Sequence, residues 1–232
     1  MLPGYSIEML EDKIGYVFQN RELVRQALTH SSYANERKIN KIDDYERLEF
    51  LGDADFELYS SEFLFRENPS MPEGKLTKTR ASMVCEPALA FCAREIELQS
   101  YIYLGKGEEA TGGRKRESII SDVMEALIGA IYLDGGFEKC KQFIHRFILS
   151  DLDNKVLFYD AKTILQERVQ KMGMEITYVL AKEEGPEHDK VFYVDAYQGE
   201  TLIGTGKGHS KKAAEQQAAY EALKKGIHHT CI

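Results

Sequence analysis

Apolar residues recur at helical spacing through the first two thirds of the chain. After Asn20, a residue type that often caps helices, Leu23 and Ala27 lie four positions apart. The same spacing predicts further helices at 45–65, 75–96, 117–133 and 137–149. Polar or glycine- and proline-containing stretches separate these segments and predict loops at 35–44 and 105–113 and a turn at 72–74. The pattern therefore predicts an all-α domain.

The pattern changes after a short polar stretch at 151–155, which we interpret as a linker. An amphipathic segment at 163–172 ends at Gly173, and an alanine-rich helix begins at Ser210. Between them, β-branched and aromatic residues predict three strands at 175–182, 190–197 and 200–206. We therefore expect a multidomain protein, in which an all-α domain at 1–152 precedes a small α+β domain of order α-β-β-β-α at 160–228.

Acidic residues gather on one face of the helix predicted at 45–65. Glu46, Glu49 and Asp53 are three and seven positions apart, which places them in one stripe. Like charges at this spacing destabilise a helix by about 0.2–0.5 kcal/mol per pair, so we expect a divalent cation to offset them. The side of the helix that we expect to be buried carries Leu48, Leu51 and Leu58.

A second acidic pair, Asp122 and Glu125, lies on the helix predicted at 117–133. The small residues Ala126, Gly129 and Ala130 follow it and allow another helix to approach closely. If the two acidic helices cross, four carboxylates converge into an oxygen-rich site that suits Mg²⁺ or Mn²⁺. A solvated surface is the simpler explanation for one such pair, whereas two pairs beside small or apolar residues favour a metal site.

Composition and charge narrow the class of protein. The 232 residues are 43% hydrophobic, and no apolar run approaches the roughly 20 residues that cross a bilayer. The first 14 residues lack the features of a signal peptide, so we expect a cytoplasmic protein without a membrane partner. Four scattered cysteines without CxxC spacing predict reduced thiols. The net charge of −8 argues against a nucleic-acid partner, but residues 156–232 contribute only −1 of it.

Several ordered segments resemble ribonuclease III. The stretch ERLEFLGDA at 46–54 resembles the signature of that family, and DVMEALIGA at 122–130 resembles its second catalytic segment. ALTHSSY at 27–33 adds to the similarity. The α-β-β-β-α tail resembles a double-stranded-RNA-binding domain, so the similarity covers nearly the whole chain. It implies the simple bacterial form, which has one nuclease domain and one RNA-binding domain.

The resemblance also implies an activity and its residues. The expected reaction is hydrolysis of double-stranded RNA with Mg²⁺, for which Mn²⁺ substitutes, and without an organic cofactor. A metal-bound water attacks phosphorus, and the products carry 5′-phosphate and 3′-hydroxyl ends. A homodimer would cut both strands, and the expected biological role is the processing of rRNA, mRNA and other RNA. The metal-binding acids correspond to Glu49, Asp53, Asp122 and Glu125, of which Asp53 and Glu125 are catalytic, and the supporting acids to Glu46 and Glu73.

The RNA contacts implied for the tail lie in three places. Double-stranded-RNA-binding domains contact two successive minor grooves and the phosphates between them over about 16 base pairs. The corresponding residues here are Gln166 and Glu167, His188, and Lys211 and Lys212. Glu215 stands where the family often has a third lysine, so we expect weaker phosphate binding.

Three features leave alternatives open. Asp55 stands where the family usually has an aliphatic residue, so we expect a partner for it or local exposure, and its effect on dimer strength is open. We interpret His30 as a packed or capping residue rather than a ligand. The basic cluster 114–116 is either a solvated loop or an RNA contact, and we favour the contact. The rival functions are a non-catalytic RNA-binding protein and a helical phosphohydrolase for small nucleotides.

Overall fold

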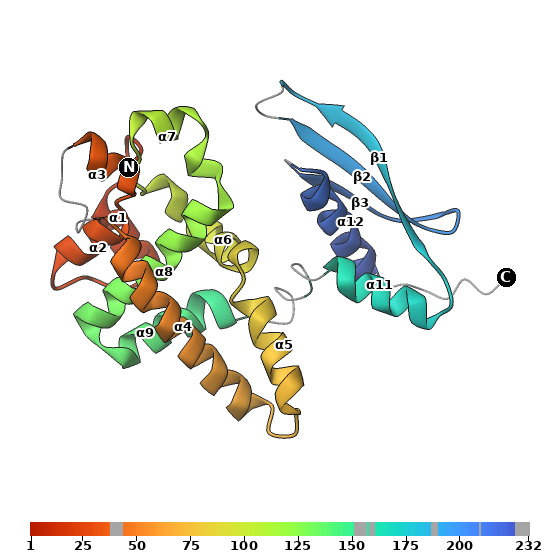
Figure 1. The fold of residues 1–232 in the computed structure, drawn as a ribbon, viewed down its shortest axis with the longest axis horizontal. Helices are drawn as coiled ribbons and strands as arrows, with labels where there is room; N and C mark the ends of the chain where they lie inside the picture. Colours follow the sequence, from red (N-terminus) through yellow and green to blue (C-terminus); the bar gives the residue numbers. More distant parts are fainter. Residues whose placement is uncertain (38–43, 151–156, 158–160, 187–189, 209, 226–232) are drawn as a thin grey trace. The chain divides into compact units, whose positions relative to one another are not determined.

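The computed structural model describes residues 1–37, 44–150, 157, 161–186, 190–208 and 210–225. The chain divides into two compact units, Met1–Ser150 and Asp151–Ile232, which are described separately (Figure 1). The predicted linker at 151–155 and His188 lie outside the described residues. The domain limits of 1–152 and 160–228 remain a proposal.

The first unit consists of helices, as the apolar spacing predicts. Its helices are α1 (Ile7–Ile14), α2 (Arg21–Ala27), α3 (Ser31–Glu36), α4 (Glu46–Glu67), α5 (Glu73–Met83), α6 (Glu86–Glu95), α7 (Lys106–Ala110), α8 (Glu117–Gly135) and α9 (Phe137–Ile144). Short helical turns lie at η2 (Leu98–Ser100), η3 (Gly113–Lys115) and η4 (His145–Leu149). In α8 every residue from Val123 to Ile131 except Glu125 is buried, so α8 forms the centre of this unit.

The crossing of α4 and α8 depends on two glycines (Figure 1). A Cβ atom added to Gly52 would lie 1.8 Å from the carbonyl oxygen of Glu125. A Cβ added to Gly129 would lie 2.3 Å from the carbonyl oxygen of Leu48. Any larger residue would push the helices apart. Because Gly52 lies between Glu49 and Asp53, this close approach carries the acidic stripe of α4 to the acidic residues of α8.

The structure corrects several local predictions. The helix predicted at 75–96 is two helices, because Pro87 lies in the first turn of α6 and a helix cannot continue through that position. The loop predicted at 105–113 contains α7. Leu58 is 59% exposed rather than buried. It lies about 80° around the helix from Leu48, away from the side on which Gly52 and Phe56 are buried.

Asp55 is buried rather than exposed, and its Oδ2 atom has no hydrogen-bond partner among the described residues. Its side chain is 8% exposed. Burial raises the pKa of Asp55. Burial and the Asp55 charge together raise the pKa of the Cys140 thiol to about 12. An ionisable group is thus buried where an apolar residue would fit.

We expect Asp55→Val to stabilise the first unit by about 1–3 kcal/mol at neutral pH, because it removes an unpaired buried carboxylate. A thermal melt should show a midpoint raised by about 2–4 °C per kcal/mol. The pKa of Asp55 is higher in the folded state, so the folding penalty is absent below its ordinary pKa and grows as the pH rises. The gain should therefore shrink toward pH 4, and Asp55→Asn, which keeps a polar side chain, should gain less. A midpoint unchanged at neutral pH would contradict this account.

The second unit has the predicted order α-β-β-β-α. It comprises α11 (Ala161–Lys171), β1 (Ile176–Glu184), β2 (Val191–Gln198), β3 (Thr201–Gly208) and α12 (Lys211–Lys225). The antiparallel sheet has the order β1-β2-β3. Leu165 of α11 and Leu223 of α12 belong to one buried cluster, which packs against residues of the sheet. A Cβ added to Gly204 or Gly206 would lie 2.2 Å from a carbonyl oxygen of α12, so these glycines let β3 contact that helix directly.

Candidate metal centre

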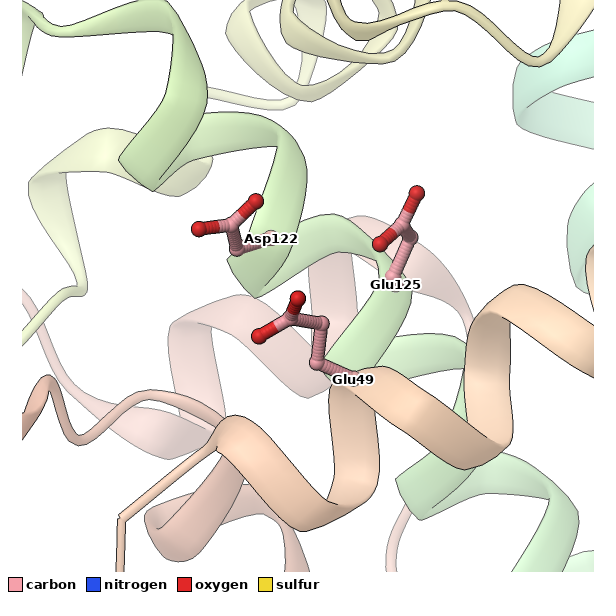
Figure 2. Close-up of side chains that lie close together, drawn as sticks. All are labelled: Glu49, Asp122 and Glu125. Carbon is pink, nitrogen blue, oxygen red and sulfur yellow. The ribbon is translucent and has the colours of Figure 1, made fainter.

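Three carboxylates converge where α4 crosses α8. Glu49 lies in the first turn of α4, and Asp122 and Glu125 lie about one turn apart on α8. Each offers one oxygen atom, and these atoms all lie within 4.8 Å of one another. Figure 2 shows the three side chains gathered in the space between the two helices. Oxygen atoms this close are a donor set that suits a hard divalent cation.

The other predicted acids lie outside this group of three. Asp53 is exposed, but its charge helps to raise the pKa of both Glu49 and Glu125. Glu46 is also exposed and raises the pKa of Glu49. Glu73 begins α5, where its carboxylate accepts a hydrogen bond of 2.9 Å from the Thr77 hydroxyl. The structure thus groups three of the four predicted ligands and leaves Asp53 beside them, and all four ligand assignments remain predictions.

The electrostatics of the cluster favour a cation. Burial, followed by neighbouring carboxylates, raises the pKa of Glu49 to about 7 and that of Glu125 to about 8. Burial raises the pKa of Asp122 as well, although the hydrogen bond from Tyr45 opposes the change. Among the described residues, no lysine or arginine contributes to the pKa of these three groups. The residues present therefore fit a divalent metal ion, which would supply the missing positive charge.

We expect the metal-free protein to lose stability as the pH rises from about 5.5 to 8.5. The pKa values of Glu49 and Glu125 are above 4.5 in the folded state, so folding takes up protons over this range and deprotonation costs stability. Thermal melts should show a midpoint that falls by roughly 4 °C or more. Added Mg²⁺ should restore more stability at the higher pH, where protons no longer compete with it. The same pH dependence in Glu125→Gln would contradict the assignment to this cluster.

The predicted RNA contacts that the structure describes lie on α11 and at the start of α12. Gln166 is half-buried and Glu167 is exposed on α11. Lys211 and Lys212 are exposed in the first turn of α12. The Ser210 side chain accepts a hydrogen bond of 3.1 Å from the backbone N–H of Ala213, as predicted for a helix cap.

Two acidic residues lie close to basic groups of this surface. The Lys211 ammonium is 3.7 Å from a carboxylate oxygen of Glu183. Glu215, which stands at the position of the family's third lysine, forms an ion pair with Lys162. The negative charge of Glu215 is therefore offset within the unit.

The basic cluster at 114–116 is largely part of the fold. The Arg114 guanidinium donates a hydrogen bond of 3.0 Å to the carbonyl oxygen of Ile102 and forms an ion pair with Glu109. Arg116 lies 2.7 Å from the carboxylate of Glu108. An RNA contact by Arg114 would require these bonds to break, so our preference for such a contact loses support. His30 caps α3 by accepting a hydrogen bond of 3.1 Å from the Ser32 N–H, in line with our interpretation.

An exposed apolar groove on the first unit was missed by the sequence analysis. The Phe50 side chain is 81% exposed and Leu133 is 54% exposed. They border a groove of about 630 Å³ that is lined by Leu23, Gln26, Glu46, Arg47, Leu48, Phe50, Leu51 and Leu133. The available signal was Phe50 itself, an aromatic residue on the polar side of a helix.

Among the described residues, no helix has the length and apolar character needed to span a bilayer.

Comparisons with known proteins agree with the fold of both units. Residues 20–152 match the family described as Ribonuclease-III-like, and residues 161–225 match the double-stranded RNA binding motif. Ribonuclease 3 of Caldanaerobacter subterraneus is 49% identical over 220 residues, which cover 93% of this chain and 96% of the relative. Ribonuclease 3 of Enterococcus faecalis is 50% identical over 218 residues, which cover 93% of this chain and 95% of that one.

Solved structures show the same fold for the first unit. The nuclease domain of ribonuclease III from Campylobacter jejuni is 41% identical, with a TM-score of 0.59. The match covers 62% of this chain and 97% of that domain. That structure is described as showing structural flexibility in the region involved in dimer formation.

Proposed function

Because the chain belongs to the ribonuclease III family, we propose that its acidic cluster binds Mg²⁺ and that it cuts double-stranded RNA to leave 5′-phosphate and 3′-hydroxyl ends. The family and the RNA-binding domain both support the function of an endoribonuclease that acts on double-stranded RNA. The observation that carries the proposal is the convergence of Glu49, Asp122 and Glu125 in a chain that also has an RNA-binding domain.

The predicted acidic residues have two kinds of proposed role, as metal ligands and as supporting residues. Glu49, Asp53, Asp122 and Glu125 hold the metal, and Mn²⁺ substitutes for Mg²⁺. When bound, the ion lowers the pKa of a water ligand and stabilises the charge on the phosphate oxygens. Asp53 and Glu125 are the proposed catalytic residues. Glu46 and Glu73 have supporting roles toward the metal or the RNA.

The RNA-binding unit supplies affinity for the duplex. Lys211 and Lys212, at the amino end of α12, are proposed to contact phosphates, where ammonium groups and free backbone N–H groups act together. Gln166 and Glu167 are proposed to reach one minor groove and His188 the other. Because these contacts read the shape of the duplex rather than its sequence, the enzyme should bind many duplexes.

We further propose that the enzyme is a homodimer joined through the Phe50 groove. The groove combines an exposed aromatic side chain with a largely apolar hollow on one surface, and in a two-fold contact each copy's aromatic side chain can enter the hollow of the other. The related Campylobacter structure, whose description mentions dimer formation, supports this proposal. Two protomers would present two sites and cut both strands. A cytoplasmic location and a role in rRNA and mRNA processing complete the proposal.

The decisive experiment is to incubate a long RNA duplex with the full chain and Mg²⁺. We expect short duplex products whose 5′ ends lose phosphate to a phosphatase, and no cleavage of single-stranded RNA or of a DNA duplex. Binding without cleavage would favour the non-catalytic RNA-binding protein. Hydrolysis of small nucleotides alone would favour the phosphohydrolase.

A further inference from the structure

Tyr45 is joined to both acidic helices of the proposed metal site. It lies directly before α4, and its carbonyl oxygen accepts a hydrogen bond of 2.9 Å from the backbone N–H of Glu49. Its hydroxyl donates a hydrogen bond of 3.2 Å to Oδ2 of Asp122, which is 77 residues away in the sequence. One residue therefore links the backbone of one proposed ligand to the carboxylate of another.

The Tyr45 ring is held in place from several sides. The side chain is 5% exposed, so it is too buried to lie against RNA. Its ring centroid is 5.6 Å from that of His30, which is itself fixed as the cap of α3. The Tyr45 N–H donates a hydrogen bond of 2.9 Å to the carbonyl oxygen of Thr29. The burial, the ring contact and the backbone hydrogen bond keep the Tyr45 hydroxyl beside Asp122.

We infer that Tyr45 is a positioning residue that acts through Asp122 by holding its carboxylate in the orientation that binds the metal. This inference rests on the proposed metal site. Groups that hydrogen-bond to metal ligands orient them, and their loss typically weakens metal binding about 10- to 100-fold. The bond from the Tyr45 hydroxyl to Asp122 is 3.2 Å, which is longer than usual for an O–H···O hydrogen bond, so its effect belongs at the lower end of that range.

The test is Tyr45→Phe, which keeps the ring and removes only the hydroxyl. Mn²⁺ binding to the full chain without RNA is measured from the electron paramagnetic resonance signal of free Mn²⁺. We expect the dissociation constant to rise about tenfold. Tyr16→Phe is the matched control, because the Tyr16 hydroxyl donates a 2.7 Å hydrogen bond to Asp134 outside the acidic cluster, and it should leave Mn²⁺ binding unchanged.

A second measurement separates positioning from a general loss of structure. Cleavage by Tyr45→Phe should need about tenfold more Mn²⁺ for half of its maximal rate, and saturating Mn²⁺ should restore that rate. A dissociation constant within twofold of wild type would overturn the role of Tyr45 and leave the metal site standing. Absence of Mn²⁺ binding by the wild-type protein would overturn both.

Discussion

Glu125→Gln should lower the rate of duplex cleavage by about 10³-fold or more. Glutamine keeps the size of the side chain and removes its charge. Burial and the acidic neighbours raise the pKa of Glu125 to about 8. A bound metal contributes several kcal/mol of charge stabilisation in the transition state, and each 1.4 kcal/mol is worth about tenfold in rate. The rate is measured in single-turnover assays with saturating enzyme, Mg²⁺ and a labelled duplex.

Duplex binding by Glu125→Gln should stay within about twofold of wild type, because the residues proposed to supply affinity for the duplex lie in the second unit. Glu117→Gln is the matched control, since Glu117 lies on the same helix but pairs with Arg94 at 3.1 Å. It should cut at the wild-type rate. If Glu125→Gln also cuts at that rate, Glu125 is not a metal ligand; if both variants lose activity, the effect belongs to the helix and not to the cluster.

Phe50→Asp should weaken dimerisation by at least about 100-fold. Burying a phenylalanine side chain contributes about 1.5–3 kcal/mol, and a two-fold contact buries it twice. A carboxylate at the same place would also have to lose its water in an apolar groove. Sedimentation velocity over a range of concentrations measures the change, and cleavage assays should show single-strand nicks in place of breaks through both strands.

Phe65→Asp is the control variant, because it replaces another exposed phenylalanine of the same helix by aspartate. Phe65 is 73% exposed on the same helix and does not line the groove. Its replacement should leave the dimer intact. A wild-type chain that sediments as a monomer, or a Phe50→Asp variant that sediments as the wild-type dimer, would rule out this interface.

The regular elements were predictable because their patterns are local. Apolar residues three and four positions apart predicted α4 and α8, and runs of β-branched and aromatic residues predicted the three strands. The failures had two different causes. The break before α6 is local, because Pro87 lies in its first turn, whereas Leu58 is exposed because α8 covers a different face of α4.

The site was predictable in its residue types and only partly in its geometry. The acidic stripes on α4 and α8 are visible in the sequence. The resemblance of the segments 46–54 and 122–130 to ribonuclease III indicates that their acidic residues form one metal site. Tyr45 could not be recognised, because its link to Asp122 spans 77 residues. The unpartnered state of Asp55 was equally hidden, since the residues that surround a buried group come from other helices.

The sequence by itself determined which side chains share a helix face or a strand face, the order of the two domains, and the family. The tertiary structure decided that Glu49 meets Asp122 and Glu125 while Asp53 stays exposed beside them. The physical reason is that periodicity acts between near neighbours, whereas the position of one helix on another depends on backbone contact. In this protein, Gly52 and Gly129 provide that contact by allowing α4 and α8 to touch.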